Sequence, residues 1–86
     1  MMQLYYSSKF ERAYKKLPQK IKSALGEKEA LLRKNPFNST LNTHKLSGRL
    51  EGYWAFWIDQ KYRVIFEFSG KNILWLHSVG DHSIYR

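Results

Sequence analysis

The sequence predicts an α+β domain in which an N-terminal strand and a two-helix hairpin precede a three-stranded antiparallel meander, forming a twisted sheet with the helices on one face. Two observations lead to this fold class. Apolar residues recur at helical spacing between positions 8 and 34, whereas positions 50–79 are rich in aromatic and β-branched residues interrupted by short turns. The chain of 86 residues contains no repeat or linker, so we expect a single domain over residues 1–86.

A short strand and an amphipathic helix are expected first. Residues 2–6 form a strand-like run. Ser8 followed by Glu11 has the form of a capping box, in which two side chains bond the free N–H groups at a helix start. Apolar side chains then fall at i, i+3, i+4 and i+7, which predicts a helix with one apolar face over residues 8–17.

A second helix should follow directly. Pro18 is excluded from a helix interior but suits a first turn. Asn35 and Pro36 are expected to end the helix, because a residue before proline avoids helical backbone angles. The apolar face of this helix comprises Ile21, Ala24, Leu25 and Leu32. Residues 36–43 are rich in turn-forming side chains, and we expect a loop there.

Three strands are predicted next, over residues 50–58, 62–69 and 72–79, separated by the turn-forming letters DQK and GK. Alternation in the second strand directs one set of side chains to the core and another to the opposite face: Tyr62, Val64, Phe66 and Phe68 against Arg63, Ile65, Glu67 and Ser69. Alternation in the third strand places His77 on the same side as Val79, which favours an inner histidine. The rings expected in the core, with base stacking as the alternative, are Trp54, Phe56, Trp57 and Trp75.

The charge of the chain favours a polyanionic partner. It carries 15 Lys and Arg against 7 Asp and Glu, a formal net charge of +8. Nucleic acid is the first candidate and an acidic protein the second. No apolar run approaches the length of a membrane-spanning helix, and the N-terminus lacks the pattern of a secretory signal, so we expect no membrane association and a cytoplasmic location. Cysteine is absent, which excludes disulfides and thiolate metal sites.

Histidine and basic side chains occur at three places that a twisted antiparallel sheet would bring together. These places are the segment before the first long strand, the central hairpin and the C-terminus. The residues are His44, Lys45, Arg49, Lys61, Arg63, His77, Asp81, His82, Tyr85 and Arg86. A face with imidazoles and cations but no carboxylate pair suits an anionic substrate.

This set of side chains is able to cleave RNA without a metal or another cofactor. A base takes the proton of a ribose 2′-OH, the oxygen attacks the adjacent phosphate, an acid protonates the leaving 5′-oxygen, and a fixed cation stabilises the phosphorane. Histidine suits the proton transfers and arginine suits the phosphorane. His44 and His82 are therefore the acid–base candidates and Arg63 the phosphate clamp. The expected RNA-binding rim comprises Lys45, Arg49 and Lys61.

Each assignment has a structural alternative. His44 and His82 could be surface imidazoles, and the basic residues of the helices could form a solvated face. Arg63 could pair with Glu67, its neighbour along the same face of the strand. We expect no metal site, because the C-terminal histidines and Asp81 match no common ligand spacing.

The chain resembles the RelE/ParE superfamily of toxins from bacterial type II toxin–antitoxin systems, and most closely its RelE/YafQ/YoeB-like branch. The resemblance covers nearly the whole chain and is carried by the ordered segments FERAYKKLP, NP, HKLSGRLEGYWAFWI, YRVIFEF and VGDHSIYR. It implies a small toxin that enters the ribosomal A site, cuts mRNA without a metal and so inhibits translation. It also implies a cognate antitoxin that silences the toxin in a hetero-oligomer.

Position by position, the resemblance assigns roles to individual residues. His44, before KLSG, matches a catalytic histidine of YafQ-like members. Arg63 matches the arginine of the YRVI strand that stabilises phosphate, and His82 matches the C-terminal catalytic histidine of YafQ- and YoeB-like members. Tyr85 lies near a functional tyrosine of some RelE members, and we expect Tyr85 and Arg86 to contact RNA.

The chain also departs from the family pattern. Where YafQ-like members carry a further histidine and an aspartate, this sequence has Trp57 and Lys61. The glutamate base of YoeB-like members has only a distant counterpart in Glu51. Two alternatives therefore stay open: a ParE-like poison of DNA gyrase, which shares the fold but lacks the nuclease site, and a member that binds an antitoxin but has lost catalysis.

Overall fold

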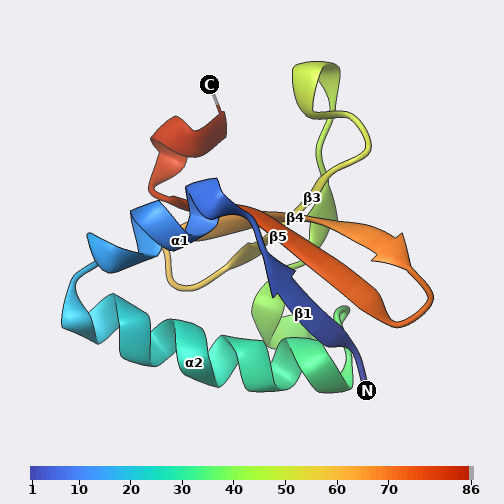
Figure 1. Cartoon of the computed structure of the whole chain (residues 1–86), viewed down its shortest axis with the longest axis horizontal. Coiled ribbons are helices and arrows are strands. Elements are labelled where there is room, and N and C mark those ends of the chain that lie inside the picture. The colour runs from blue at the N-terminus through green and yellow to red at the C-terminus, as the bar shows by residue number, and fades with distance from the viewer. Residues whose placement is uncertain (86) are drawn as a thin grey trace.

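The computed structural model describes residues 1–85, in which two α-helices and a five-stranded sheet form an α+β fold (Figure 1). The strands are β1 (Gln3–Tyr6), β2 (His44–Lys45), β3 (Trp54–Trp57), β4 (Arg63–Gly70) and β5 (Ile73–Gly80). They lie in the order β1-β5-β4-β3-β2. The antiparallel meander of β3, β4 and β5 is confirmed, but it is the centre of a wider sheet. β2 extends it antiparallel at one edge, and β1 extends it parallel at the other.

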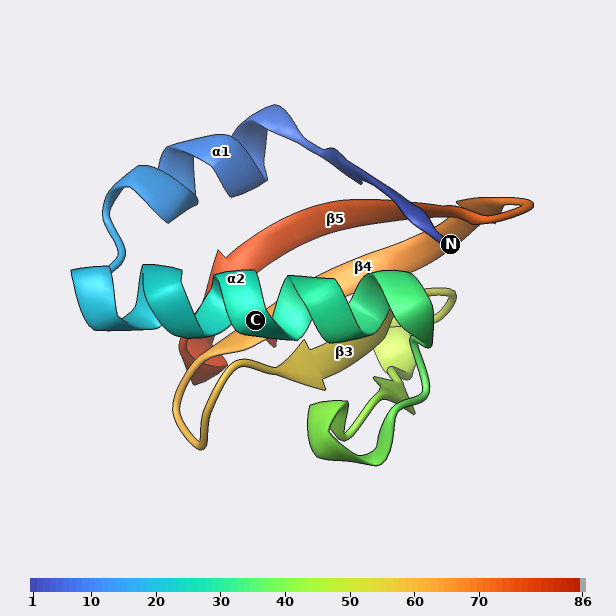
Figure 2. The ribbon, with the colours of Figure 1, turned by 90° about the horizontal axis from the view of Figure 1, so that it is seen from below.

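Both helices pack on one face of this sheet. α1 (Ser8–Lys15) and α2 (Gln19–Lys34) agree with the predicted helices to within two residues at each end, and α2 runs across the sheet (Figure 2). The buried core cluster joins the helical half of the chain to the sheet through Phe10, Leu17, Ile21, Leu25, Leu32, Leu41, Phe56, Ile58, Val64, Phe66, Leu74, Leu76 and Val79. Neither helix of the described chain is long and apolar enough to cross a bilayer.

The start of α1 differs from the prediction. The N-cap is Ser7 and not Ser8, so the predicted capping box with Glu11 is wrong. The Ser7 hydroxyl accepts a hydrogen bond from the Phe10 N–H at 2.9 Å and donates one to the His77 carbonyl at 2.6 Å. Ser7 is therefore the N-cap in place of Ser8, because its hydroxyl can cap the helix and bond a carbonyl of β5 at the same time.

The first long strand is shorter than predicted. Residues 50–53 lie outside the sheet because Gly48 and Gly52 adopt positive φ angles of 66° and 96°, which bend the chain in a way that side chains with a Cβ disfavour. β3 therefore begins only at Trp54. Three 3-10 helices occur between or after the strands of the described chain: η1 (Ser39–Leu41) within the predicted loop, η2 (Gly48–Leu50) and η3 (His82–Tyr85).

A bulge in β5 changes which side chains face the core. Ser78 and Leu76 pair with consecutive residues of β4, so His77 between them has no partner. Val79 consequently joins Leu76 in the core cluster. The predicted grouping of His77 with Val79 is wrong: the half-buried His77 ring instead packs on Tyr53, with centroids 5.1 Å apart.

Two segments project from the side of the sheet opposite α2. They are η3, red in Figure 1, and the connection between β2 and β3, yellow-green in the same view. η3 contacts both β4 and β5. The second sheet face is therefore flanked by these two segments, and the candidate site lies between them.

Candidate functional site

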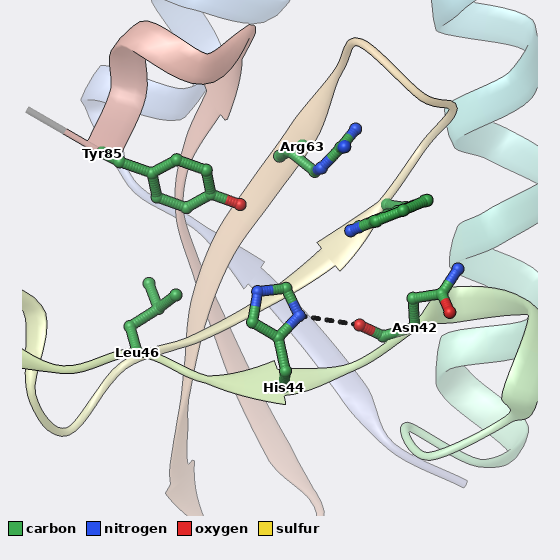
Figure 3. A pocket seen from close by; sticks show the side chains of 6 residues that line it. Asn42, His44, Leu46, Arg63 and Tyr85 are labelled. Atoms are coloured by element: carbon green, nitrogen blue, oxygen red, sulfur yellow. Dashed lines mark hydrogen bonds between the residues drawn. The ribbon is translucent and has the colours of Figure 1, made fainter.

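A cavity of about 550 Å³ lies between β2 and η3 (Figure 3). The lining side chains come from segments far apart in the sequence: Asn42, His44, Leu46, Trp57, Arg63 and Tyr85. Because Arg63 alternates with the core residue Val64 along β4, the cavity lies on the face opposite the core cluster. The structure thus brings His44, Arg63 and Tyr85, all predicted from the sequence, to one place.

His44 is oriented as a proton acceptor. Its Nδ1 lies 2.8 Å from the carbonyl oxygen of Asn42. A carbonyl only accepts, so Nδ1 carries the proton and Nε2 of the neutral ring offers a lone pair. Asn42 has a left-handed backbone (φ 52°), which asparagine tolerates and which places its carbonyl beside the ring. Figure 3 shows the other ring nitrogen directed into the cavity, toward Tyr85.

Arg63 is a buried cation, only 6% exposed. Its Nη1 donates to the backbone carbonyls of Asp59 and Tyr62, the latter at 3.2 Å, and its guanidinium carbon lies 4.1 Å from the Trp57 ring centroid. Within residues 1–85 the guanidinium binds these carbonyls and interacts with the Tyr85 hydroxyl but has no carboxylate partner, so the alternative pairing with Glu67 is not adopted. A buried charge without a counter-charge is unfavourable, and an anion in the cavity would relieve that cost.

The turn that holds Arg63 is fixed by the side chain of Asp59. This carboxylate accepts hydrogen bonds from the backbone N–H groups of Lys61 at 2.9 Å and Tyr62 at 2.7 Å. The Ile58 N–H donates to the Tyr62 carbonyl at 2.9 Å and closes the hairpin. Asp59 therefore acts as the turn-forming residue that the letters DQK predicted, and it holds the two carbonyls where the guanidinium needs them.

Tyr85 supplies a protonated hydroxyl to the same cavity. Burial raises the pKa of its phenol, and the nearby Arg63 guanidinium opposes that rise by favouring the phenolate. The net shift is upward, so the Tyr85 hydroxyl keeps its proton at neutral pH. In Figure 3 the hydroxyl points into the space between Arg63 and His44.

The position of η3, which carries Tyr85, depends on the two residues before it. A Cβ added at Gly80 would lie 2.7 Å from Ile84 Cγ2, so glycine permits the close return of η3 over the end of β5. Asp81 accepts a hydrogen bond from the Ser83 N–H at 2.9 Å. Hydrogen bonds from the side chain and backbone of Ser83 hold the pKa of Asp81 below its usual range, so this carboxylate stays ionised and anchors the turn.

His82 lies outside this lining. It begins η3 and is exposed, with its ring perpendicular to that of Tyr85 and the two centroids 6.5 Å apart. Its catalytic role stays a prediction. In the described part of the chain, no three histidine or acidic side chains form a group that could hold a metal ion.

The three residues of the predicted RNA-binding rim do not line the cavity. Lys45 lies beside His44 in β2 but packs over the Trp54 ring at 5.4 Å, on the other side of the strand. Arg49 in η2 and Lys61 in the β3–β4 turn are both exposed. Arg86 lies outside the described residues.

Sequence reasoning missed three lining residues: Asn42, Leu46 and Trp57. Trp57 was expected in the core but is half-buried at the cavity wall. A signal for it was present, because the second residue before the predicted DQK turn faces the second residue after it, which here is Arg63. No comparable signal marked Asn42, whose contribution is a backbone carbonyl.

Comparison with solved structures identifies the fold. YafQ from E. coli has a TM-score of 0.79 and 21% identity over 99% of this chain and 98% of its own. The YoeB/ParE toxin from Agrobacterium tumefaciens has a TM-score of 0.80 and 19% identity over 94% of this chain and 99% of its own. A chain of the toxin–antitoxin complex RelBE2 from Mycobacterium tuberculosis has a TM-score of 0.78 and 18% identity over 94% of this chain and 98% of its own. No family model and no curated protein matches the sequence. The chain therefore has the fold that its sequence resemblance implied.

Proposed function

We propose that this protein is the toxin of a type II toxin–antitoxin system and a metal-independent mRNA endoribonuclease that acts in the ribosomal A site and inhibits translation. One observation carries the proposal. The Arg63 guanidinium is buried, has no carboxylate partner within residues 1–85, and lines a cavity together with His44 and Tyr85. A phosphodiester would supply the missing negative charge, and the imidazole and phenol are suited to proton transfer. The fold shared with the YoeB/ParE toxin and the toxin–antitoxin complex RelBE2 supports the toxin part of the proposal.

The chemistry follows from the positions of three groups. His44 Nε2 takes the proton of a ribose 2′-OH, and the 2′-oxygen forms a bond to the adjacent phosphorus. Arg63 stabilises the negative charge of the phosphorane. The bond from phosphorus to the 5′-oxygen then breaks, and the Tyr85 hydroxyl gives its proton to that oxygen. The products are a 2′,3′-cyclic phosphate and a 5′-hydroxyl, and solvent returns the His44 proton to the Tyr85 phenolate.

Tyr85 is the preferred acid because it lines the cavity, whereas His82 does not. His82 is the alternative acid that the sequence predicted. Its ring is a neighbour of the Tyr85 ring, with the two centroids 6.5 Å apart. The two assignments differ in which substitution removes activity.

We also propose a cognate antitoxin as protein partner. The net charge of +8 favours an acidic protein, and solved structures with this fold include a DinJ–YafQ complex and the RelBE2 toxin–antitoxin complex. An antitoxin that covers the cavity would prevent access of mRNA. The partners would then form a hetero-oligomer in the cytoplasm.

The test is cleavage of a defined mRNA in a reconstituted translation reaction, with the 3′ ends of the products identified chemically. Wild-type protein should give 2′,3′-cyclic phosphate ends, and Arg63→Ala should slow cleavage by about 100- to 1,000-fold because the phosphorane loses its cation. Arg63→Lys is the matched control. It keeps the charge but not the planar fork, and we expect an intermediate rate. Equal rates for wild type and Arg63→Ala would contradict the proposal.

The same preparations separate the two alternatives. A protein that cuts no mRNA but blocks DNA supercoiling by gyrase would be a ParE-like poison. A protein inactive in both assays that still binds the product of a neighbouring antitoxin gene would be a member without catalysis. Either result would overturn the nuclease proposal.

A further inference from the structure

We propose that Trp57 is the positioning residue of this site, whose indole face fixes the Arg63 guanidinium in the orientation that receives the phosphate without neutralising its charge. The inference rests on the proposed nuclease function. Trp57 ends β3 and pairs directly with Arg63, which begins β4. The guanidinium carbon lies 4.1 Å from the ring centroid, within the range of a cation–π contact.

A phosphate-binding arginine has two conflicting requirements. Its planar fork must be held in one orientation, because a bidentate contact needs both N–H groups aligned with the anion. Its charge must also stay available. A carboxylate partner would meet the first requirement but not the second, since it would cancel the guanidinium charge and repel the incoming phosphate.

The surroundings of Arg63 meet both requirements. Carbonyls bind through partial charges, and both backbone hydrogen bonds of the guanidinium, to Asp59 and Tyr62, use Nη1. The indole face of Trp57 adds a contact with the guanidinium carbon, which restricts movement of the fork. The Nε and Nη2 groups are thereby left in a fixed plane at the wall of the cavity. A preoriented cation of this kind needs little rearrangement when charge develops on the phosphorane.

The competing explanation is that Trp57 only fills space at the end of the sheet. Trp54 provides a matched control for this explanation. It lies in the same strand, is also half-buried and also has a cation near its ring, the Lys45 ammonium at 5.4 Å. Trp54 packs against the core cluster on the opposite face and does not line the cavity. Loss of its ring should therefore affect packing but not the phosphate site.

The experiment compares Trp57→Leu, Trp57→Phe and Trp54→Leu by two measurements. The first is the dissociation constant for a short 2′-fluoro RNA oligonucleotide, which cannot be cleaved because it lacks the 2′-OH. The second is the chemical shift of the Arg63 Nε–H proton, which the Trp57 ring current displaces. We expect Trp57→Leu to weaken binding about tenfold and to abolish the displaced shift. Trp57→Phe should bind within about threefold of wild type, and Trp54→Leu should bind like wild type.

Each contrary outcome has a distinct meaning. Equal weakening by Trp57→Leu and Trp57→Phe, or wild-type binding by Trp57→Leu, would overturn the positioning role alone. A wild-type protein that neither binds the oligonucleotide nor cuts mRNA would overturn the proposed function as well. Thermal unfolding is followed for every variant. If Trp57→Leu does not fold, Trp57→Met replaces it, because the flexible thioether fills the volume without a ring face.

Discussion

The two faces of the sheet use the same strands but hold their side chains by different physical means. On the face under α1 and α2, apolar side chains such as Val64 and Phe66 are buried against one another in the core cluster. On the opposite face, the buried Arg63 is held by directed contacts to carbonyls and an aromatic ring. Because β4 supplies both faces through alternate residues, a single strand provides stability on one side and the candidate chemistry on the other.

This difference implies that stability and activity can be changed separately. Nondirectional apolar packing tolerates small rearrangements but loses free energy in proportion to the volume removed. A cavity built from oriented polar groups contributes less to stability, yet it depends on the placement of single atoms. Substitutions that are matched in size and placed on opposite faces therefore test the comparison.

The largest effect on stability is expected on the covered face. Phe66→Ala should lower the free energy of unfolding by about 3–5 kcal/mol, because it leaves a cavity in the core cluster. The control is Phe68→Ala, two residues along the same face, whose ring is 37% exposed and should cost less. Urea unfolding measures both values. Equal losses of stability would show that Phe68 contributes to the core as much as Phe66 does, which would contradict the buried cluster described above.

On the cavity face, substitution of His44 should reduce activity and leave stability nearly unchanged. We expect His44→Ala to slow mRNA cleavage about 100-fold or more, equivalent to about 3 kcal/mol in the activation barrier, because it removes the proposed general base. Stability should change little because His44 is exposed. His82→Ala is the matched control outside the lining, and it should cost less than about tenfold. A larger loss of activity in His82→Ala would favour His82 over Tyr85 as the general acid.

Smaller effects on both cleavage and stability are expected at Gly80, the last residue of β5. Gly80→Ala places a Cβ against Ile84 and should displace η3, moving Tyr85 away from the cavity. We expect cleavage to fall about tenfold and the free energy of unfolding to fall by about 1–2 kcal/mol. Gly70→Ala is the control at the β4–β5 turn, where a Cβ would make an ordinary contact of 3.6 Å. Unchanged cleavage by Gly80→Ala would indicate that η3 does not position an essential group.

The covered face was largely predictable from the sequence, and the cavity face only in part. Helical periodicity and strand alternation report on apolar burial, so the helices and the core residues of β4 were predicted. The bulge at His77 was not, because it arises from pairing between strands and not from local pattern. The strand β2 was also missed, since its two residues, His44 and Lys45, carry no pattern of their own.

The individual site residues were easier to predict than their supports. Arg63, His44 and Tyr85 are chemically distinctive side chains and were singled out from the sequence. Their supports were not, because the Asn42 carbonyl contributes through its backbone and Trp57 has the composition of a core residue. Sequence identifies the groups that perform chemistry, but the groups that orient them depend on tertiary contacts.

Two tyrosines extend the comparison of the two faces to electrostatics. On the covered side, burial and a 2.8 Å hydrogen bond to the Glu29 carboxylate raise the pKa of Tyr6 to about 12. In the cavity, burial also raises the pKa of Tyr85, but there the Arg63 cation opposes the rise. Arg33 also opposes the rise at Tyr6, but there the Glu29 carboxylate outweighs it, whereas the charge acting on Tyr85 is the Arg63 cation. Glu29→Gln should lower the pKa of Tyr6, and Arg63→Ala should raise that of Tyr85.

Tyrosine ring resonances followed by NMR across alkaline pH measure both shifts. The sign for stability follows from linkage: a phenol with a raised pKa in the folded state contributes stability that is complete below pH 10 and is lost as pH rises toward 12. Tyr6→Phe should therefore flatten this part of the stability profile relative to wild type, although the lysines titrate in both proteins. Shifts of the same sign in Glu29→Gln and Arg63→Ala would mean that burial alone sets both tyrosines, and that the cavity face is not electrostatically distinct from the core face.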